Sequence, residues 1–272
     1  MRSTTRRFSH FRIASLVLGV FVLGAIPGRV AAEPSPAAVS TFNAYIGSVE
    51  SRLSRQHKSQ SSFLVSVAAQ SELRLRSGDI VVEKVESATG SGLPGAMLFH
   101  WRGTAFAPGA KTADFERLMR DFEAYPQHFY PQVIHAKTLA HKGDFFQASM
   151  RVRQRHVITV VMDTAYDIVF GRLDERNGYS ISRSTRIDEI DEPGARNEHA
   201  LRPGQEHGFL WRLNTYWSYE ETDGGLYMQI ESVSLTRSIP LGLGWAIGPF
   251  VESVPRESLE FTLRSVCNSL RK

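Results

Sequence analysis

Glu231 is the residue whose type and surroundings could most readily do chemistry. It stands in the alternating stretch 226–237, where Val233 and Leu235 would share its face of a strand. A carboxylate among apolar neighbours is either protonated or paired with a cation. The pattern leaves two interpretations: a structural ion pair or outward-facing carboxylate, and a polar anchor that holds part of a ligand.

Three arginines on predicted strands are candidate partners for this carboxylate, namely Arg183, Arg186 and Arg237. A nearby guanidinium would keep Glu231 ionised, whereas burial without one would raise its pKa into the range of an acid–base catalyst. Two classes of function follow. In a binding protein, Glu231 and Arg183 would line the ligand site. In an enzyme, Glu231 or a neighbouring His or Tyr would move protons.

Aromatic side chains alternate along the stretch 209–221 and could line a binding site. A strand has a side-chain period of two, which places the apolar residues Trp211, Leu213, Trp217 and Tyr219, together with Thr215, on one face. Such a face would offer a small molecule a broad apolar surface. The four apolar residues are therefore candidate ligand-binding residues.

The stretch 145–155 separates its apolar and charged residues cleanly. Met150 and Val152 belong to an apolar face that we expect to point inward and to contact a ligand. The opposite face carries three arginines, at positions 151, 153 and 155. Such a ladder is typical of a solvated surface, although an anionic membrane or partner would also fit it.

The C-terminal region combines an apolar segment with an amphipathic helix. Residues 239–251 (IPLGLGWAIGPFV) include Trp245 and are consistent with core packing, with a hinge that lets the helix lift, or with an apolar tip in transient contact with a membrane. Pro255 then suits the first turn of a helix whose apolar stripe includes Leu259 and Leu263. Trp245, Leu259 and Leu263 complete the candidate ligand-binding residues.

The other motifs predict no catalytic, metal or cofactor site. Residues 90–95 (GSGLPG) fit the glycine pattern of nucleotide-binding loops, but the proline and the strand-like run after it indicate a turn. The spacing of His128, His135 and His141 puts the first two on opposite faces of a strand, which disfavours a shared metal. Cys267, the only cysteine of the sequence, is expected to be buried in the C-terminal helix.

The order of predicted elements describes an α+β domain. A helix over 37–53 precedes strands at 79–85 and 97–107 and a helix at 111–123. Strands with turn signals between them follow over 132–141, 145–155, 158–171, 179–189, 209–221 and 226–237. The polar segment 191–208 interrupts them as a long loop, and loops of this length are usually functional or disordered.

With this order of elements the chain resembles the START/SRPBCC superfamily, which includes the birch-pollen-allergen-like and polyketide cyclase-like proteins. The resemblance covers residues 79–272, and the stretch 209–270 looks most like bacterial members, with paired strands, a Pro–Gly passage and a final helix. It implies a helix-grip fold, in which a curved antiparallel sheet of about seven or eight strands grips a long C-terminal helix. It also implies a cavity between sheet and helix for a lipid, a sterol-like molecule or a polyketide.

The N-terminal segment has the features of a secretory signal peptide. Its first 32 residues contain five arginines, no acidic residue, and an apolar run of 14 residues at 13–26, followed by small residues at a cleavage site predicted near Ala32. Its removal leaves 27 basic against 28 acidic residues, a formal charge of −1 in place of +4. The basic character thus belongs to the export signal, and nucleic-acid binding loses its electrostatic support.

The sequence therefore predicts an exported protein, periplasmic or secreted. Its expected domains are the signal peptide at 1–32, a linker and helical extension at 33–78, and the START-like domain at 79–272. We expect a monomer without a cofactor that binds or carries a hydrophobic small molecule in the cavity. The alternative is a cyclase/dehydratase-type enzyme that acts on an aromatic or polyketide substrate in the same cavity.

Overall fold

The computed structural model describes residues 33–85, 93–155, 159–238 and 244–271, with side chains described only from Ser253 onward in the last range. These residues belong to one compact unit, Ala31–Lys272. The predicted signal peptide lies outside the described residues. Within the described ranges, no helix is both long and apolar enough to cross a membrane.

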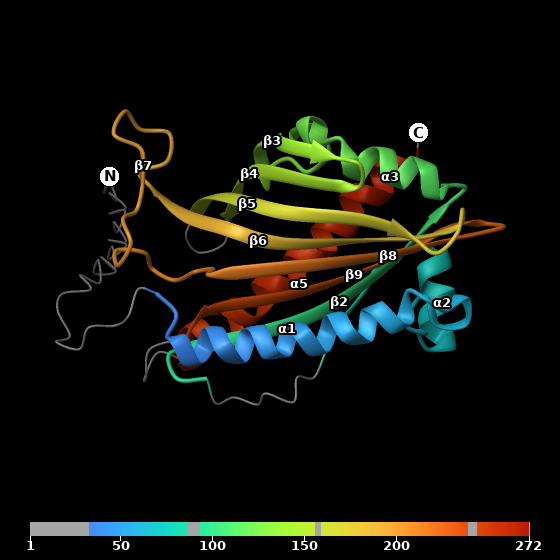
Figure 1. Ribbon diagram of the computed structural model, residues 1–272, viewed down its shortest axis with the longest axis horizontal. Coiled ribbons are helices and arrows are strands. Elements are labelled where there is room, and N and C mark those ends of the chain that lie inside the picture. Colours follow the sequence, from blue (N-terminus) through green and yellow to red (C-terminus); the bar gives the residue numbers. More distant parts are fainter. Residues whose placement is uncertain (1–32, 86–92, 156–158, 239–243, 272) are drawn as a thin grey trace, which may run out of the picture. The chain divides into compact units, whose positions relative to one another are not determined.

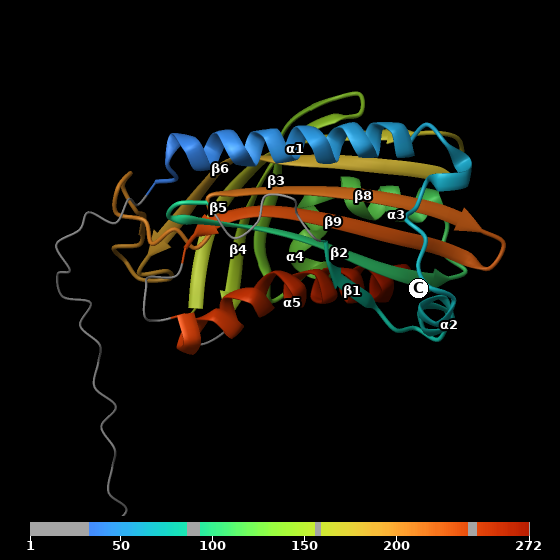
Figure 2. The same cartoon turned by 90° about the horizontal axis from the view of Figure 1, so that it is seen from below.

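Strands form the middle of the molecule, with the first helix and the long C-terminal helix on opposite sides of them (Figure 1 and Figure 2). The helices are α1 (Pro36–Gln56), α2 (Ala69–Arg76), α3 (Thr112–Arg120), α4 (Tyr125–His128) and α5 (Gly244–Leu270), with short 3-10 turns η1 (Gln60–Ser62) and η2 (Phe122–Ala124). The strands are β1 (Val81–Lys84), β2 (Ala96–Pro108), β3 (Val133–Lys142), β4 (Phe145–Arg155), β5 (Thr159–Arg172), β6 (Asn177–Asp191), β7 (His199–Ala200), β8 (Arg212–Thr222) and β9 (Gly225–Arg237).

The strands form one antiparallel sheet in the order β1-β2-β9-β8-β6-β5-β4-β3, with the short β7 paired beside β6. Strand β3, which follows β2 in the sequence, lies at the far edge of the sheet. The later strands then line up from that edge, so that β9 lies beside β2. Figure 2 shows α1 on one face of this sheet and α5 on the other. We call the face under α1 the outer face and the face under α5 the inner face.

The outer face is covered by an amphipathic helix. In α1, Phe42, Ile46, Val49 and Leu53 recur at spacings of three and four and are buried. They share an apolar cluster with residues of the sheet, among them Val233. The segment 33–78 therefore supplies part of the core of the unit that contains the sheet.

The inner face is packed most tightly under the second half of α5. Leu259 and Leu263 are at most 4% exposed and share a core cluster with Ile230 of β9. At Gly103 of β2, a Cβ atom would lie 2.6 Å from Cδ1 of Leu263. The glycine lets helix and strand approach closely, because any side chain there would force the end of Leu263 to shift.

Most of the predicted elements are confirmed to within a few residues, and one boundary is wrong. Helix α5 begins at Gly244, so Pro255 lies inside it and not in its first turn. A proline is favoured in a first turn, but it also occurs inside long helices, where it removes one backbone hydrogen bond and kinks the helix. Within the predicted loop 191–208, the two residues of β7 pair with β6.

These elements make an α+β helix-grip fold, and the predicted fold class is confirmed. An antiparallel sheet with α5 laid across its inner face is the arrangement that the START resemblance implied. The predictions for the apolar segment 239–251 are not tested, because residues 239–243 and the side chains of 244–252 lie outside the described residues. Its predicted roles as a hinge or a membrane contact stay predictions.

Candidate functional site

Glu231 lies on the outer face, under α1, in a cluster of paired side chains. Its side chain is 3% exposed. Arg52 of α1 donates to one carboxylate oxygen, which His100 Nε2 also contacts at 2.9 Å. Arg102 contacts the other oxygen through Nη2 at 3.0 Å and donates to it through Nε at 3.1 Å. Tyr45 of α1 extends the network, with its hydroxyl 2.7 Å from His100 Nδ1.

The electrostatics of this cluster keep Glu231 ionised. Burial alone would raise the pKa of its carboxyl group, but the hydrogen bond from His100 and the charges of Arg102 and Arg52 outweigh it and lower the pKa to about 2. A permanently ionised, fully paired carboxylate is a poor proton donor or acceptor near neutral pH. The ion-pair interpretation is thus confirmed, and the cluster joins α1 to the sheet.

The predicted partners of Glu231 were wrong. Arg183 instead holds Glu50 of α1, through Nε at 2.7 Å and Nη2 at 2.8 Å. Arg186 pairs with Asp188 at 3.0 Å. The true arginine partners are Arg52 of α1, which a search among strands could not find, and Arg102 of β2, a predicted strand whose place next to β9 the sequence does not reveal.

Trp211 was also assigned to the wrong face. It belongs to the apolar cluster under α1, whereas Leu213, Trp217 and Tyr219 belong to or pack against the cluster under α5. Strand β8 begins only at Arg212, so the period of two does not extend back to Trp211. Consequently Glu231, Arg183 and Trp211 cannot line a site between the sheet and α5.

The remaining candidates divide by exposure. Trp217 and Tyr219 are 4% and 0% exposed, and the Tyr219 hydroxyl donates to Glu116 Oε1 at 2.8 Å, so both are core residues. Leu259 and Leu263 are buried against the sheet. Those that stay half-buried on the inner face are Leu213, Met150 and Val152. The side chain of Trp245 lies outside the described residues.

The strand register groups residues of the inner face into rows, because cross-strand partners project to the same side. One row across β2, β9, β8 and β6 consists of Trp101, Ser232, Thr215 and Ser182. The next row consists of Phe99, Ser234, Leu213 and Ser184, the last placed by a hydrogen bond of 2.9 Å from Leu213 N to the Ser184 hydroxyl. We call Ser182, Ser184, Thr215, Ser232 and Ser234 the hydroxyl block.

The hydroxyl block is more open than the row beside it. In that row, Ile230, Trp217 and Ser180 are 3–4% exposed beneath the second half of α5. In the block all but Ser234 are half-buried, although they stand in the middle of the sheet. Earlier residues of β2 lie toward the start of α5 (Figure 2), so the block faces the earlier part of that helix.

The sequence pattern placed Thr215 on the lining face but missed the serines of this block, because isolated serines carry little information. A signal was nevertheless present in the alternation of hydroxyl residues along two strands. Ser180, Ser182 and Ser184 alternate in β6, and Ser232 and Ser234 alternate in β9. Strand centres that face a helix usually carry large apolar side chains, so small polar ones at every second position mark an unusual surface.

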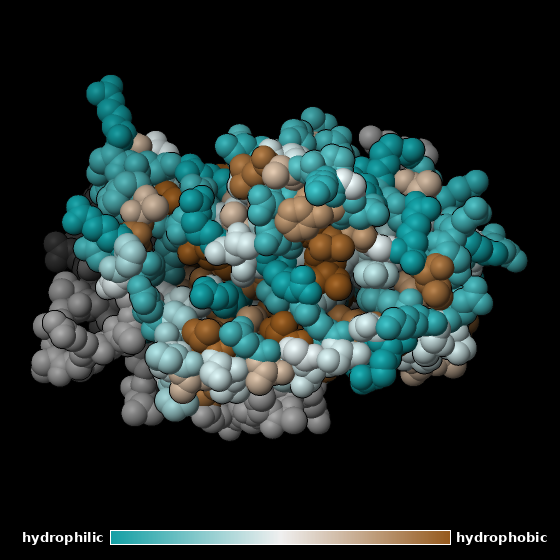
Figure 3. Space-filling view, in the orientation of Figure 1, coloured by the Kyte–Doolittle hydropathy of each residue, from teal (hydrophilic) through white to brown (hydrophobic). Residues whose placement is uncertain are grey.

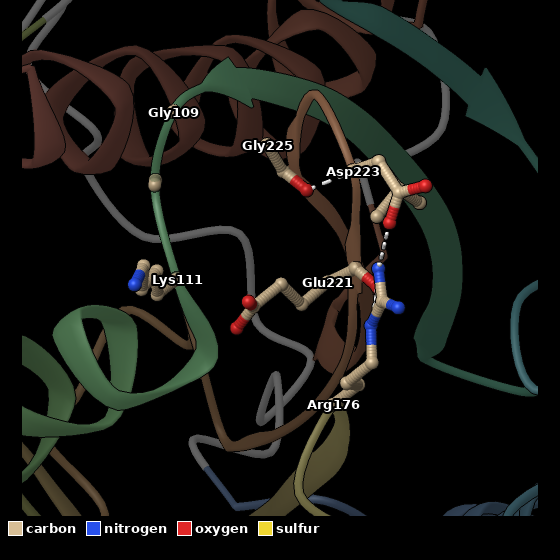
Figure 4. A pocket seen from close by; sticks show the side chains of 8 residues that line it. Gly109, Lys111, Arg176, Glu221, Asp223 and Gly225 are labelled. Carbon is tan, nitrogen blue, oxygen red and sulfur yellow. Dashed lines mark hydrogen bonds and ion pairs between the residues drawn. The ribbon is translucent and has the colours of Figure 1, made fainter.

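Two hollows lie away from the block. A pocket of about 480 Å³ is lined by α4 and the last turns of α5, including His128, Tyr130 and Arg264. A second, of about 310 Å³, is shown in Figure 4; Arg176 contacts Asp223, and the Glu221 side chain extends toward Lys111. Glu221 accepts from the backbone N of Thr112 at 2.9 Å, so this carboxylate caps the start of α3.

On the face seen in Figure 3, apolar residues appear as separate patches among hydrophilic ones. Arg151, predicted to be solvated, lies on the outer face and pairs with Asp163 at 2.7 Å and with Glu198 of the loop 191–208. The arginine ladder is therefore at least partly neutralised within the chain.

Comparisons with known proteins identify similar structures but no sequence relative. No family model matches the chain. No curated protein matches it either. Among solved structures, a STAR-related lipid transfer protein from Xanthomonas axonopodis is 18% identical over 70% of this chain and 99% of that one, with a TM-score of 0.44.

Two further structures share the same general form. The Zhui aromatase/cyclase from Streptomyces sp. R1128 is 12% identical over 64% of this chain and 94% of its own, with a TM-score of 0.45. Human STARD10 is 9% identical over 75% and 81%, with a TM-score of 0.42. At these identities the likeness concerns the fold alone. The START-like, helix-grip character of this chain follows from its own order and pairing of strands and helices.

Proposed function

We propose that the chain binds or carries a hydrophobic small molecule on the inner face, beneath the earlier part of α5. One observation carries the proposal: the centre of the sheet presents small side chains at the hydroxyl block, all but Ser234 half-buried, although α5 covers this face. Protein interiors are normally close-packed, so small residues opposite a helix leave volume that a ligand can fill. The half-buried Leu213 and Met150 would give that volume an apolar lining.

Among the side chains that the structure describes, none at this place is a suitable acid–base group for the alternative enzymatic function. The hydroxyl block contains no side chain that titrates near neutral pH. Tyr166, next to Ser184 in the same row, is buried, and burial raises the pKa of its phenol, which therefore stays protonated. Glu231, together with His57 and His100, serves the outer face. We therefore favour binding over catalysis.

Export remains part of the proposal. The signal-peptide pattern at 1–32 supports a periplasmic or secreted location, where a carrier would move an apolar molecule through an aqueous compartment. N-terminal sequencing of the protein recovered from a bacterial culture should give a chain that starts at Glu33. Recovery of an uncleaved chain in the cytoplasm would contradict export without affecting the binding proposal.

Solvent extraction tests the binding proposal. Protein purified without detergent should release a small apolar molecule into organic solvent, detected by mass spectrometry in near-stoichiometric amount. Ser232→Leu, which fills the inner face, should abolish this release. Ser149→Leu adds the same volume on the outer face of β4 and should not. Equal release from both variants would refute the assigned location.

A further inference from the structure

The hydroxyl block has unused hydrogen-bonding capacity. Within the described part of the structure, the side chains of Ser182, Thr215, Ser232 and Ser234 make no hydrogen bond with another residue. Ser184 accepts from Leu213 N and so keeps its own hydroxyl proton for another acceptor. Hydroxyls of this kind usually bond to backbone or water when they face a helix-covered interior.

A neighbouring group adds one buried donor to this capacity. The indole Nε1 of Trp101, a cross-strand partner of Ser232, is buried and has no hydrogen-bond partner. An unpaired buried donor costs about 1–3 kcal/mol. This indole N–H lies at the edge of a block of unpaired hydroxyls. Such an arrangement is expected of a binding site whose hydrogen-bond acceptors belong to the ligand.

The charges around the block restrict that ligand. No Asp, Glu, Lys or Arg belongs to the two rows that contain the block. Burial of an isolated carboxylate or ammonium without a partner is strongly unfavourable. On the outer face, by contrast, Glu231 and Glu50 each have arginine partners. Within the sheet, the described residues of these rows therefore offer no charged partner to the part of the ligand that lies on the block, which favours an uncharged group there.

The spacing of the block restricts the ligand further. Neighbouring strands lie about 4.8 Å apart, and alternate residues on one strand about 7 Å apart. Ser232, Thr215 and Ser182 extend across three strands, and Ser234 and Ser184 lie one step along the strands from that row. The hydroxyls of the block are thus spread over two dimensions. They can bond to several oxygens spread over the body of a ligand, whereas a ligand with one polar group at the end of a hydrocarbon chain would use only one or two of them.

We infer that the ligand is a neutral, apolar molecule that carries several hydroxyl, carbonyl or ether oxygens across its body, bound by the hydroxyl block and by the Trp101 indole N–H. This inference rests on the proposed function and narrows it to a chemical class. It excludes free fatty acids with their carboxylate on the block, and it excludes pure hydrocarbons as preferred ligands. Trp101 donates to a ligand oxygen, because an indole N–H cannot accept.

Three probes with one ring frame test the inference on the whole protein: 1,8-dihydroxyanthraquinone, anthracene and anthracene-2-carboxylate. Affinities are measured by equilibrium dialysis for the wild type and for the triple variant Ser182→Ala, Thr215→Val and Ser232→Ala. We expect the wild type to bind the quinone most tightly. The triple variant should lose at least tenfold in affinity for the quinone, whereas its affinity for anthracene should change less than twofold.

A matched control lies on the same strand. Ser180→Ala removes a hydroxyl beneath the packed half of α5 and should leave all three affinities unchanged. Three results would overturn the inference: equal losses for quinone and anthracene, no loss in the triple variant, or a wild type that fails to bind the quinone or prefers the carboxylate.

The nature of any copurified molecule separates this inference from the proposed function. A neutral molecule with several oxygens supports both. A fatty acid or a hydrocarbon extracted from the wild type supports binding on the inner face and refutes the assigned class. Wild-type protein that carries no molecule and binds none of the three probes refutes both.

Discussion

The two faces of the sheet treat their polar groups in opposite ways. On the outer face, Glu231 is buried with two arginines and a histidine, and Arg183 is paired with Glu50. On the inner face, the hydroxyls of Ser232 and Thr215 stay without a partner among the described residues. The comparison teaches that burial of polar residues has two meanings. Satisfied groups fasten one element to another, and unsatisfied ones are available to a ligand.

The inner face itself divides into a packed half and an open half, and this difference gives the largest expected effect. Leu263→Ala should lower the free energy of unfolding by about 3–4 kcal/mol, because the side chain is fully buried against Gly103 and leaves a cavity. Leu213→Ala, in the open half, should cost about 1 kcal/mol. Urea unfolding of both variants measures the two free energies of unfolding. Equal losses of stability would contradict the distinction between a packed and an open half.

Loss of the outer-face carboxylate should have the next largest effect. Glu231→Gln leaves Arg52 and Arg102 without their shared partner and should cost about 3 kcal/mol of stability. Ligand release per folded molecule should not change, because Glu231 lies on the opposite face from the hydroxyl block. Glu83→Gln is the matched control: it also contacts Arg102 but is half exposed, so it should cost about 0.5 kcal/mol or less. Reduced ligand binding by folded Glu231→Gln protein would contradict the separation of the faces.

Acidification should weaken the outer face in two steps. Burial, the main cause, lowers the pKa of His57 from 6.5 to about 4, so the folded state favours the neutral ring. Its contribution is complete above pH 6.5 and is lost as the pH falls through about 4, amounting to about 2–3 kcal/mol. The contribution of Glu231 is then lost between pH 4.5 and about 2. Urea midpoints measured from pH 8 to pH 2 should fall in both steps for the wild type, whereas His57→Gln should lose the fall between pH 6.5 and pH 4 and Glu231→Gln the one below it.

The smallest effect is expected where hydroxyls have no partner. The triple variant of Ser182, Thr215 and Ser232 should change stability by less than about 1 kcal/mol, because no internal hydrogen bond is removed. Ser218→Ala, on the outer face, breaks a contact of 2.7 Å with His57 Nε2 and should cost about 1–2 kcal/mol. Thermal unfolding of the two variants measures both effects. A triple variant less stable than Ser218→Ala would contradict the prediction.

The fold was more predictable from the sequence than the site. Periodicity located the strands and α1 because a period of two or of 3.6 is imposed by the backbone itself. The side chains that meet across α1 and β9 were not predictable, because Arg52 and Glu231 are far apart in the chain and no local pattern records their contact. The prediction of the face of Trp211 was wrong for a local reason, because the strand begins one residue after it. Recognition of the hydroxyl block required the register between β2, β9, β8 and β6, and only the assembled sheet provides this register.

Native mass spectrometry of the wild type and of Thr215→Phe, purified side by side without detergent, tests the central claim most directly. Thr215 lies in the middle of the block, so a phenyl ring there should fill the inner face without touching the outer one. We predict a wild-type spectrum with a mass excess of one small molecule per chain, and a folded variant with none. A wild type without bound mass, or a folded variant that keeps the same ligand, would contradict binding on the inner face.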